Sequence, residues 1–309
     1  MRLLGVELTR YASRRAIALT LLLAVGLGAL LVASAAWSTR PADSTELAAA
    51  ERLLEVNREA GEEEHQACLA APEEQLGPDA TAADCESARP QLEWFLPRNA
   101  LSLEQELDGR GTVLLALLAV VGIFVGSTFA GADWSSGSMG TQLLFAPRRL
   151  RVWTAKAVAV VLATSATAAV LLAAYWGALA AIAAARGIDT SQETWRDVVQ
   201  TSGRGVALVA AVSLGGYALT MLLRHTVGTL GLLFGYAVVG EGLAAALPFE
   251  RMSQWSMATN VRAWLQDGAR VYDDGWYTLS LEHAAAYLGV LLLLAVVASL
   301  VAFRRRDVP

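Results

Sequence analysis

Long uninterrupted runs of apolar residues are the feature that most constrains this chain. Several runs reach about 20 residues, the length that a helix needs to cross a hydrocarbon core about 30 Å thick. The chain of 309 residues is 55% hydrophobic and only 17% charged, whereas ordinary soluble domains are about 25% charged. These runs exclude a soluble enzyme, a disordered chain and a fibrous protein.

Six of the runs are predicted to be membrane-spanning helices. Membrane-spanning β-strands would be about 10 residues long and would alternate in polarity. These runs are longer and do not alternate in polarity. The helix is therefore the remaining structure that satisfies the backbone polar groups in lipid. The sequence therefore predicts an all-α integral membrane protein with six transmembrane helices. The predicted spans are residues 16–37, 112–132, 152–185, 205–223, 226–247 and 282–303.

The charges between the runs predict the side on which each segment lies. Six spans place both termini on one side. That side holds twelve basic and three acidic residues, counting Lys156 at the start of the third span and Arg224 after the fourth, whereas residues 38–111 hold six basic and seventeen acidic residues. Because cytoplasmic loops carry an excess of Lys and Arg, both termini are expected in the cytoplasm. The segments assigned to the cytoplasm are residues 1–15, 133–151 and 304–309, and those assigned outside are residues 38–111, 186–204 and 248–281.

One alternative concerns the first run. Arg14, Arg15 and the sequence Ala33-Ser34-Ala35 resemble a secretory signal with a small-residue cleavage site. The apolar run is longer than the core of such a signal, and its removal would leave an odd number of spans. We therefore expect this run to remain as a membrane span.

The extracellular segment of residues 38–111 is predicted to be a small helical cap. Asp43 and Glu46 have the spacing of a capping box at the start of a helix. The only two cysteines, Cys68 and Cys85, lie here, and an extracellular location permits a disulfide between them. The alternatives are two unpaired thiols or a metal site. A metal site would lack enough ligands. The cap is interpreted either as a solvated helical hairpin without a ligand or as a gate or docking surface.

The second large outer segment, residues 248–281, is rich in aromatic residues. Trp255, Trp264 and Trp276 lie in it, near Pro248. Because Trp favours the membrane–water interface, this spacing predicts short helices at the interface rather than a soluble domain.

The inner segment between the second and third spans has a distinctive order. Asp133 lies at the membrane exit, Ser135-Ser136-Gly137-Ser138 favours a helix break, and residues 138–145 are long enough for two helical turns on the cytoplasmic surface. Pro147 is expected to end that helix. The basic residues that follow are expected to face anionic headgroups or an acidic partner; they are Arg148, Arg149, Arg151 and Lys156.

This segment resembles the transmembrane subunits of type-2 ATP-binding-cassette exporters, the ABC-2 type permeases. Members of that family carry an acidic residue, an aromatic residue, two small residues, Gly-Ser/Thr, Leu-Leu, Pro, Arg and an Ala-Lys pair that enters the third span. The acidic residue is commonly Glu in the family and is Asp here. The matching residues are Asp133, Trp134, Gly137, Ser138, Leu143, Leu144, Pro147, Arg149, Ala155 and Lys156.

The resemblance implies that the short inner helix is a coupling helix that sits in a groove of a separate ATPase subunit. It extends along the chain to an amphipathic N-terminal helix, six spans, a large first outer segment and a broken outer segment before the last span. The alternative interpretation is an ordinary basic inner loop. The residues expected to couple to the ATPase are Asp133, Gly137, Ser138, Leu143, Leu144, Pro147, Arg148, Arg149 and Lys156.

The N-terminal residues 1–15 are predicted to form a helix that lies in the membrane interface. Glu7, Arg10 and Arg14 line one face of it, and apolar residues line another. In the family, this helix packs beside the coupling helix and touches the ATPase. The alternative is that Arg14 and Arg15 only signal orientation.

The chain lacks the residues that nucleotide binding and catalysis require. A phosphate-binding Walker loop needs Gly-x-x-x-x-Gly-Lys-Ser/Thr, and the only lysine, Lys156, has no such glycines before it. ATP and Mg²⁺ are therefore expected on the partner ATPase, and no cofactor is expected in this chain. His65, His225 and His283 lie far apart in the sequence, so they predict neither a catalytic triad nor a metal site.

Glu241 is the clear acidic residue within a predicted span. Ionisable groups inside a membrane are costly and indicate function by default, so Glu241 is a candidate for the translocation path. The alternative is an ion pair with an outer arginine such as Arg251 or Arg262.

These features predict the permease subunit of an ATP-driven exporter of a hydrophobic or amphipathic substrate, in a bacterial plasma membrane. The expected partners are separate ATPase subunits, a second permease copy or a homologue, and the lipid bilayer, without nucleic acid. Two other classes remain open: a membrane anchor or sensor whose extracellular segment does the work, and an ATP-independent transporter. The near absence of charge within the spans argues against ion coupling.

Overall fold

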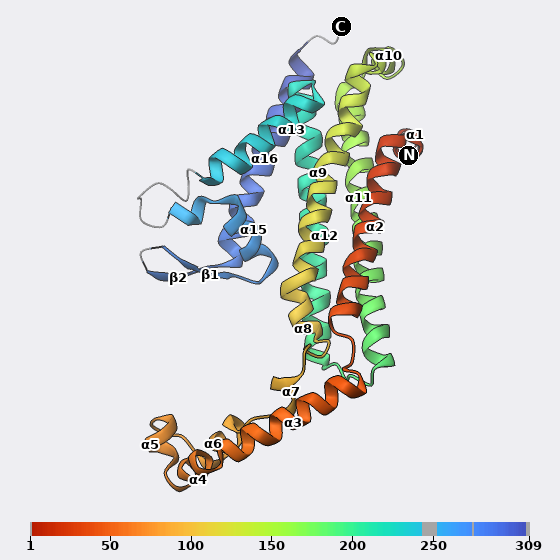
Figure 1. The fold of residues 1–309 in the computed structure, drawn as a ribbon. Coiled ribbons are helices and arrows are strands. Elements are labelled where there is room, and N and C mark those ends of the chain that lie inside the picture. Colours follow the sequence, from red (N-terminus) through yellow and green to blue (C-terminus); the bar gives the residue numbers. More distant parts are fainter. Residues whose placement is uncertain (1, 243–251, 274, 307–309) are drawn as a thin grey trace. The chain divides into compact units, whose positions relative to one another are not determined.

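The computed structural model describes residues 2–242, 252–273 and 275–306, most of which are helical (Figure 1). The chain forms two compact units. The first unit contains the segments Met1–Val32 and Leu103–Pro309, and the second is Ala33–Ser102. Each unit has its own packing and is described separately below.

Five helices of the described residues are long and apolar enough to cross a membrane. Their backbone polar groups bond within each helix, as a lipid environment requires. This agrees with the predicted helical membrane protein, with spans one, two, three, four and six each falling on one of these helices. The five helices are Arg15–Ser38, Leu103–Ser135, Arg149–Ala185, Gln192–Leu223 and Leu281–Arg305.

The predicted fifth span is helical over its first part. The α13 helix covers Thr226–Gly235 and continues into a π-helical turn, η2, over Tyr236–Gly240. This apolar helix is shorter than the five others. The predicted span runs on to residue 247, and residues 243–247 lie outside the described residues, so a sixth span stays a prediction.

Two of the long helices extend well beyond their apolar runs. The second consists of α8 (Leu103–Glu106), the π-helical turn η1 (Leu107–Gly111) and α9 (Thr112–Ser135). The fourth, α12, covers Gln192–Leu223. Ser191 caps it by accepting a hydrogen bond from the Thr194 amide at 3.0 Å, so the polar stretch that follows Ser191 is helical. The predicted outer loop of residues 186–204 therefore contains only a short connection.

The long helices pack around a core at the end of the bundle where the N-terminal helix lies. The α1 helix (Arg2–Ser13) precedes α2 (Arg15–Ser38), and α11 (Arg149–Ala185) and α16 (Leu281–Arg305) complete this end. Trp153 lies in this core and donates to the Ser299 hydroxyl at 3.1 Å. Its carbonyl oxygen accepts from the Tyr217 hydroxyl at 3.0 Å. These bonds satisfy polar groups that burial would otherwise leave unpaired.

Glycines lie at the most extensive helix–helix contact among the described residues, between α9 and α12 (Figure 1). A Cβ atom on Gly216 would lie 2.7 Å from the carbonyl oxygen of Ile123. A Cβ atom on Gly126 would overlap the carbonyl oxygen of Ser213. The two backbones therefore approach as closely as small residues allow in membrane helices.

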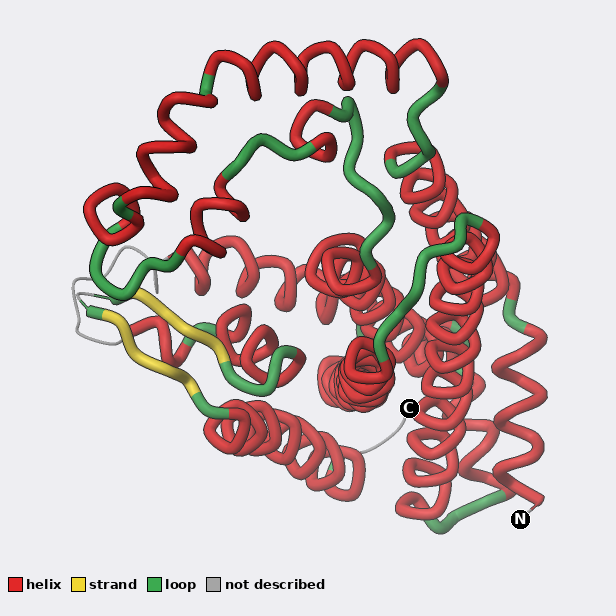
Figure 2. The backbone as a smooth tube through the Cα atoms, turned by 90° about the horizontal axis from the view of Figure 1, so that it is seen from below, coloured by secondary structure: helices red, strands yellow, loops and turns green. Residues whose placement is uncertain are grey.

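The segment that precedes α16 differs from the prediction. It contains a 3₁₀ turn, η3 (Met252–Trp255), a short helix, α15 (Met257–Leu265), and two strands, β1 (Ala269–Tyr272) and β2 (Trp276–Leu279). Figure 2 shows the strands in yellow as an antiparallel hairpin, in which Ala269 pairs with Leu279. The expected short helix is present, and the hairpin is a local addition that the prediction of short helices did not include. Buried and exposed residues alternate along both strands, the pattern of a half-buried strand.

The second unit is a small helical unit, as predicted for this segment. Its helices are α3 (Ser44–Ala60), α4 (Glu62–Ala70), α5 (Pro72–Leu76), α6 (Ala82–Ala88) and α7 (Leu92–Phe95). The Asp43–Glu46 capping box at the start of α3 is confirmed. The Cys68–Cys85 disulfide is also confirmed and joins α4 to α6.

Replacing Gly126 with Ala tests the contact between α9 and α12. The new methyl group would force the two backbones apart, and overpacking of this kind costs about 1–3 kcal/mol. The expected result is a lower thermal unfolding midpoint in detergent. The matched control is Gly177→Ala, because a Cβ there meets nothing within 4 Å. Equal midpoints for the two variants would contradict the close contact.

The carboxylates that cap helices in the second unit predict an acid sensitivity. Hydrogen bonds from the Thr45 hydroxyl and the Glu46 amide lower the pKa of Asp43. The Arg98 guanidinium lowers the pKa of Glu46, and bonds from the Thr81 hydroxyl and amide lower the pKa of Asp84. Because these pKa values are lower in the folded state, their stabilisation is present above the unfolded-state values and is lost as pH falls through the lowered ones.

Hydrogen exchange of the full-length protein measures this effect. The first turns of α3 and α6 are expected to lose protection as the pH falls below about 4, where the unfolded-state pKa values lie, toward the lowered folded-state values, after correction for the intrinsic exchange rate. Amides in the middle of α9 serve as the reference. Unchanged protection of both first turns, relative to α9, would show that the capping carboxylates do not stabilise the unit.

Candidate functional site

A buried lysine lies at the centre of the site. The Lys156 ammonium on α11 is 2.8 Å from a carboxylate oxygen of Glu7 on α1, and it also pairs with Asp133 on α9. The side chains of Lys156 and Glu7 are fully buried, and that of Asp133 is nearly so. A buried charge is costly unless it is paired and hydrogen-bonded. The three charges therefore hold α1, α9 and α11 together.

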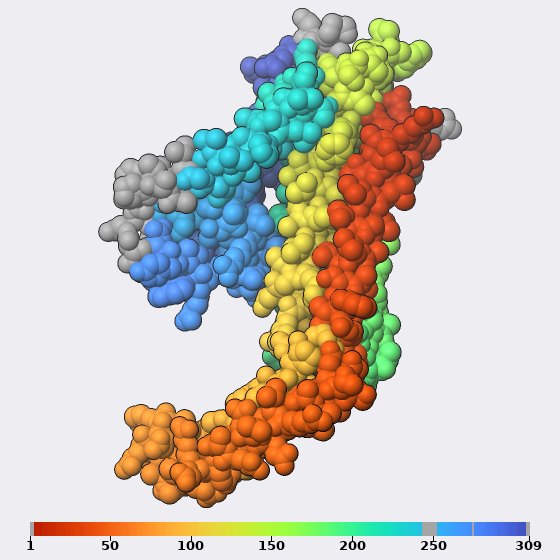
Figure 3. Space-filling view, in the orientation of Figure 1, coloured from red at the N-terminus to blue at the C-terminus, as the bar shows by residue number. Residues whose placement is uncertain are grey.

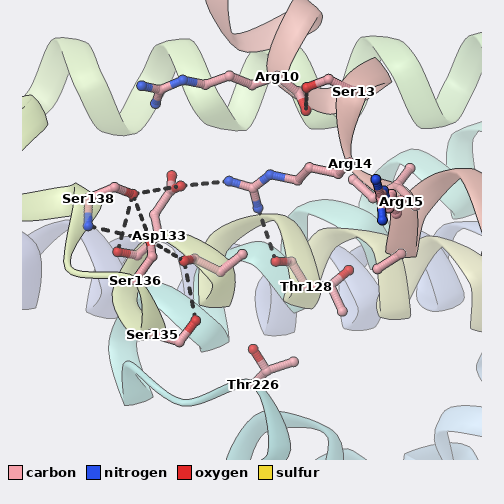
Figure 4. A pocket seen from close by; sticks show the side chains of 13 residues that line it. Arg10, Ser13, Arg14, Arg15, Thr128, Asp133, Ser135, Ser136, Ser138 and Thr226 are labelled. Atoms are coloured by element: carbon pink, nitrogen blue, oxygen red, sulfur yellow. Dashed lines mark hydrogen bonds and ion pairs between the residues drawn. The ribbon is translucent and has the colours of Figure 1, made fainter.

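Glu7, Asp133 and Lys156 form a buried cluster of charges. Arg14, in the short break between α1 and α2, adds a further charge to this cluster. One of its terminal nitrogens donates to Asp133 at 2.6 Å, and the other donates to the carbonyl oxygens of Phe129 at 2.6 Å and Thr128 at 3.2 Å (Figure 4). Its guanidinium also lies 4.7 Å from the centre of the Phe129 ring, close enough for a cation–π interaction. Arg14 thus attaches the start of α2 to the end of α9.

The short helix α10, over Ser138–Phe145, is joined to the same charges. Gln142 donates to Glu7 at 2.7 Å, and the Ser138 hydroxyl donates to Asp133 at 3.2 Å. Gly137 precedes the helix with a φ of 69°, a left-handed conformation that glycine adopts without steric cost. The turn after α9 therefore places α10 directly against the cluster.

The end of α10 presents apolar side chains to the surroundings. Leu144 is 82% exposed and Phe145 is 86% exposed, whereas Leu143 packs against the core. Pro147 follows shortly after. Exposed apolar residues next to each other favour a contact surface, so the tip of α10 is the part of this site that is available to a partner.

Some of the expected orientations are wrong. Lys156 was expected to face headgroups or a partner, yet it is fully buried because Glu7 and Asp133 neutralise it. Arg149 donates to the carbonyl oxygens of Phe303 at 3.2 Å and Arg306 at 2.5 Å. It therefore binds the C-terminal end of α16, where free carbonyls attract a cation. Arg148 and Arg151 are exposed, as expected.

Glu241 caps a neighbouring helix. Its carboxylate accepts hydrogen bonds from the Ser256 hydroxyl at 2.5 Å and the Met257 amide at 2.8 Å, at the start of α15. Arg262 donates to Gln266, and Arg251 lies outside the described residues. A carboxylate at a helix N-terminus is stabilised by the free amides there. The assignment of Glu241 to a translocation path stays a prediction.

Sequence reasoning missed a further buried carboxylate. Glu106 was placed in the outer loop, but it is buried in α8, pairs with Arg110 and accepts from the Tyr175 hydroxyl of α11 at 3.4 Å. The spacing of Glu106 and Arg110, four residues apart, was an available signal of a helical ion pair. Gln142 was also missed, because an amide has no charge that singles it out.

Across the described part of the chain, no group of three or more His, Cys, Asp or Glu side chains is arranged to hold a metal ion. No protein-family profile matches the chain, and no curated protein or solved structure is significantly similar to it.

Replacing Lys156 with Met tests the central ion pairs. The change leaves Glu7 and Asp133 buried without the ammonium, and breaking a buried pair in this way costs about 3–5 kcal/mol. The expected result is a large fall in the thermal unfolding midpoint in detergent. The control is Arg151→Met, because this exposed residue lies on the same helix. If both variants unfold at the same temperature, the buried cluster does not stabilise the bundle.

Proposed function

We propose that the chain is the transmembrane permease subunit of an ATP-driven exporter, with α10 as its coupling helix. Separate ATPase subunits bind ATP and Mg²⁺, and this chain converts their movement into transport of a hydrophobic or amphipathic substrate. The observation that carries the proposal is the position of α10. Its apolar tip is exposed, and its polar side chains are bonded to the buried cluster.

The contacts of α10 supply a path for mechanical coupling. A partner that moves the tip of α10 moves Gln142 and Ser138 with it, and these residues are bonded to Glu7 and Asp133. Separating the charges of the cluster would be costly in a buried environment. Movement of α10 is therefore passed to the helices that carry the cluster, which are α1, α9 and α11.

The proposed arrangement is a six-span subunit with both termini in the cytoplasm of a bacterium. Five apolar helices and the distribution of charges along the sequence support this topology. In this topology α1 and α10 lie at the inner surface and the disulfide-bonded unit lies outside. Two copies, or this chain and a homologue, enclose the transport path between them.

A membrane anchor that works through its outer segment accounts less well for these observations. An anchor requires neither an exposed apolar tip on α10 nor a buried network of charges beneath it. An ion-coupled transporter would need ionisable groups free to bind an ion within its spans, whereas Asp133, Glu7 and Glu241 are each bonded to protein groups.

A double substitution at the tip of α10 tests the proposal. Leu144→Asp with Phe145→Asp is expected to reduce ATPase co-purification from native membranes at least about tenfold, because each change places a charge in an apolar contact. The unfolding midpoint of the chain itself is expected to stay unchanged, since both side chains are exposed. The measurements are mass spectrometry of the co-purified subunits and Mg²⁺-dependent ATP hydrolysis.

The matched control is Val56→Asp with Leu76→Asp, which changes two exposed apolar residues of the second unit. This control is expected to keep the ATPase bound and active. A wild-type preparation that contains no chain with a Walker loop and hydrolyses no ATP would refute the proposed function. Retention of the ATPase by the α10 variant would refute the role of α10.

A further inference from the structure

Beside the buried cluster lies an open cavity of about 690 Å³ that is rich in arginine. Arg10, Arg14 and Arg15 line it, together with several hydroxyl side chains and one carboxylate, Asp133 (Figure 4). The cavity is formed by the end of α1, the start of α2 and the turn between α9 and α10. Helix packing accounts for Arg14, which attaches α2 to α9, but it does not account for Arg15.

The charges around the cavity do not balance. Lys156 and Arg14 are sufficient to neutralise Glu7 and Asp133, to which they are bonded. Arg10 then makes two long contacts, 3.5 Å to Glu7 and 3.4 Å to the side-chain oxygen of Gln142, and is 40% exposed. Arg15 is exposed, and its side chain has no hydrogen-bond or ion-pair partner within the described ranges. Two positive charges are therefore available to an anion.

Two helices also begin at this cavity. The first turn of α2 lines it through Arg15, Ala16 and Ile17, and α10 begins there at Ser138. The first amides of a helix have no acceptor within the helix, and they carry a partial positive charge that attracts anions such as phosphate. At the start of α10, Gly137 has no side chain to cap the helix, and the Ser138 amide makes a long bond of 3.4 Å to the Ser136 hydroxyl. Both helix ends therefore reinforce the positive potential of the arginines.

An apolar surface continues from the cavity along α2. Leu19, Leu22 and Leu23 follow within two turns of Arg15 and are 67%, 66% and 61% exposed. Figure 3 shows α2 lying open on this face of the first unit. Since α2 is long and apolar enough to cross a membrane, these leucines would contact lipid tails. A positively charged cavity next to this apolar surface matches the anionic headgroup and the apolar tails of a phospholipid.

We propose that this cavity binds the phosphate group of an anionic lipid, with Arg15 as its main ligand, Arg10 adding positive potential, and the lipid tails along α2. The site holds the headgroup at the level where α2 enters the membrane. Free phosphate shares the chemistry of the headgroup but lacks the tails. The proposal concerns this chain alone and does not depend on an ATPase partner.

The test measures lipid binding by the full-length chain in neutral detergent, with phosphatidylglycerol, phosphatidylcholine and inorganic phosphate as separate probes. Native mass spectrometry and the shift of the unfolding midpoint report binding. Phosphatidylglycerol is expected to bind at least about tenfold more tightly than phosphatidylcholine. Arg10→Gln with Arg15→Gln is expected to weaken the binding of phosphatidylglycerol at least about tenfold, because the Arg15–phosphate contact is a charge-assisted hydrogen bond and Arg10 adds positive potential.

The matched control is Arg148→Gln with Arg151→Gln, which removes two exposed arginines that do not line the cavity. This control is expected to bind phosphatidylglycerol as the wild type does. The single variant Arg15→Gln repeats the test if the double variant does not fold. Equal binding of both lipids by the wild type, or unchanged binding by the cavity variants, would overturn the proposal. Binding of inorganic phosphate without phosphatidylglycerol would overturn the lipid as the source of the phosphate.

Discussion

The pairing of one buried ammonium with two carboxylates is the interaction on which the rest of this structure depends. Lys156 is the only lysine of the chain, and it is fully buried between Glu7 and Asp133. Charges removed from water in this way must stay paired. The three helices that carry them, α1, α9 and α11, are therefore held in one fixed arrangement relative to each other. Arg14 and Gln142 complete the bonding of the two carboxylates. The position of α10, the break between α1 and α2, and the arginine-lined cavity all follow from this arrangement.

Features with a local cause were predictable from the sequence. Apolar runs of about twenty residues indicate helices because lipid leaves the backbone no other partner. The capping box of Asp43 and Glu46 needs only residues three apart, and the Cys68–Cys85 disulfide needs only two cysteines in one segment. The break at Gly137 and the helix that follows it were also visible, because glycine and serine favour turns and helix starts.

Features that depend on distant segments were not predictable in this way. Glu7 and Lys156 are 149 residues apart, so their burial depends on how three helices meet, and each residue alone looks like a surface charge. The start of α12 at Gln192 lies in polar sequence, where hydropathy carries no signal for a membrane helix. The hairpin of β1 and β2 is built from four-residue strands, which are too short for a reliable periodicity. Glu241 caps a helix that lies later in the chain.

The continuity of α11 has a consequence for how distant parts of the bundle respond to each other. With 37 residues, this helix is about 55 Å long at 1.5 Å per residue, almost twice the thickness of a hydrocarbon core. It carries Lys156 near one end and, about 28 Å further along, Tyr175, which donates to the buried Glu106. An unbroken helix behaves as a stiff rod, so a tilt that begins at Lys156 also displaces Tyr175. The contacts of Lys156 and those of Tyr175 therefore lie on one continuous helix. A rigid-body movement of α11 at one of these contacts also displaces the other, unless the helix bends between them.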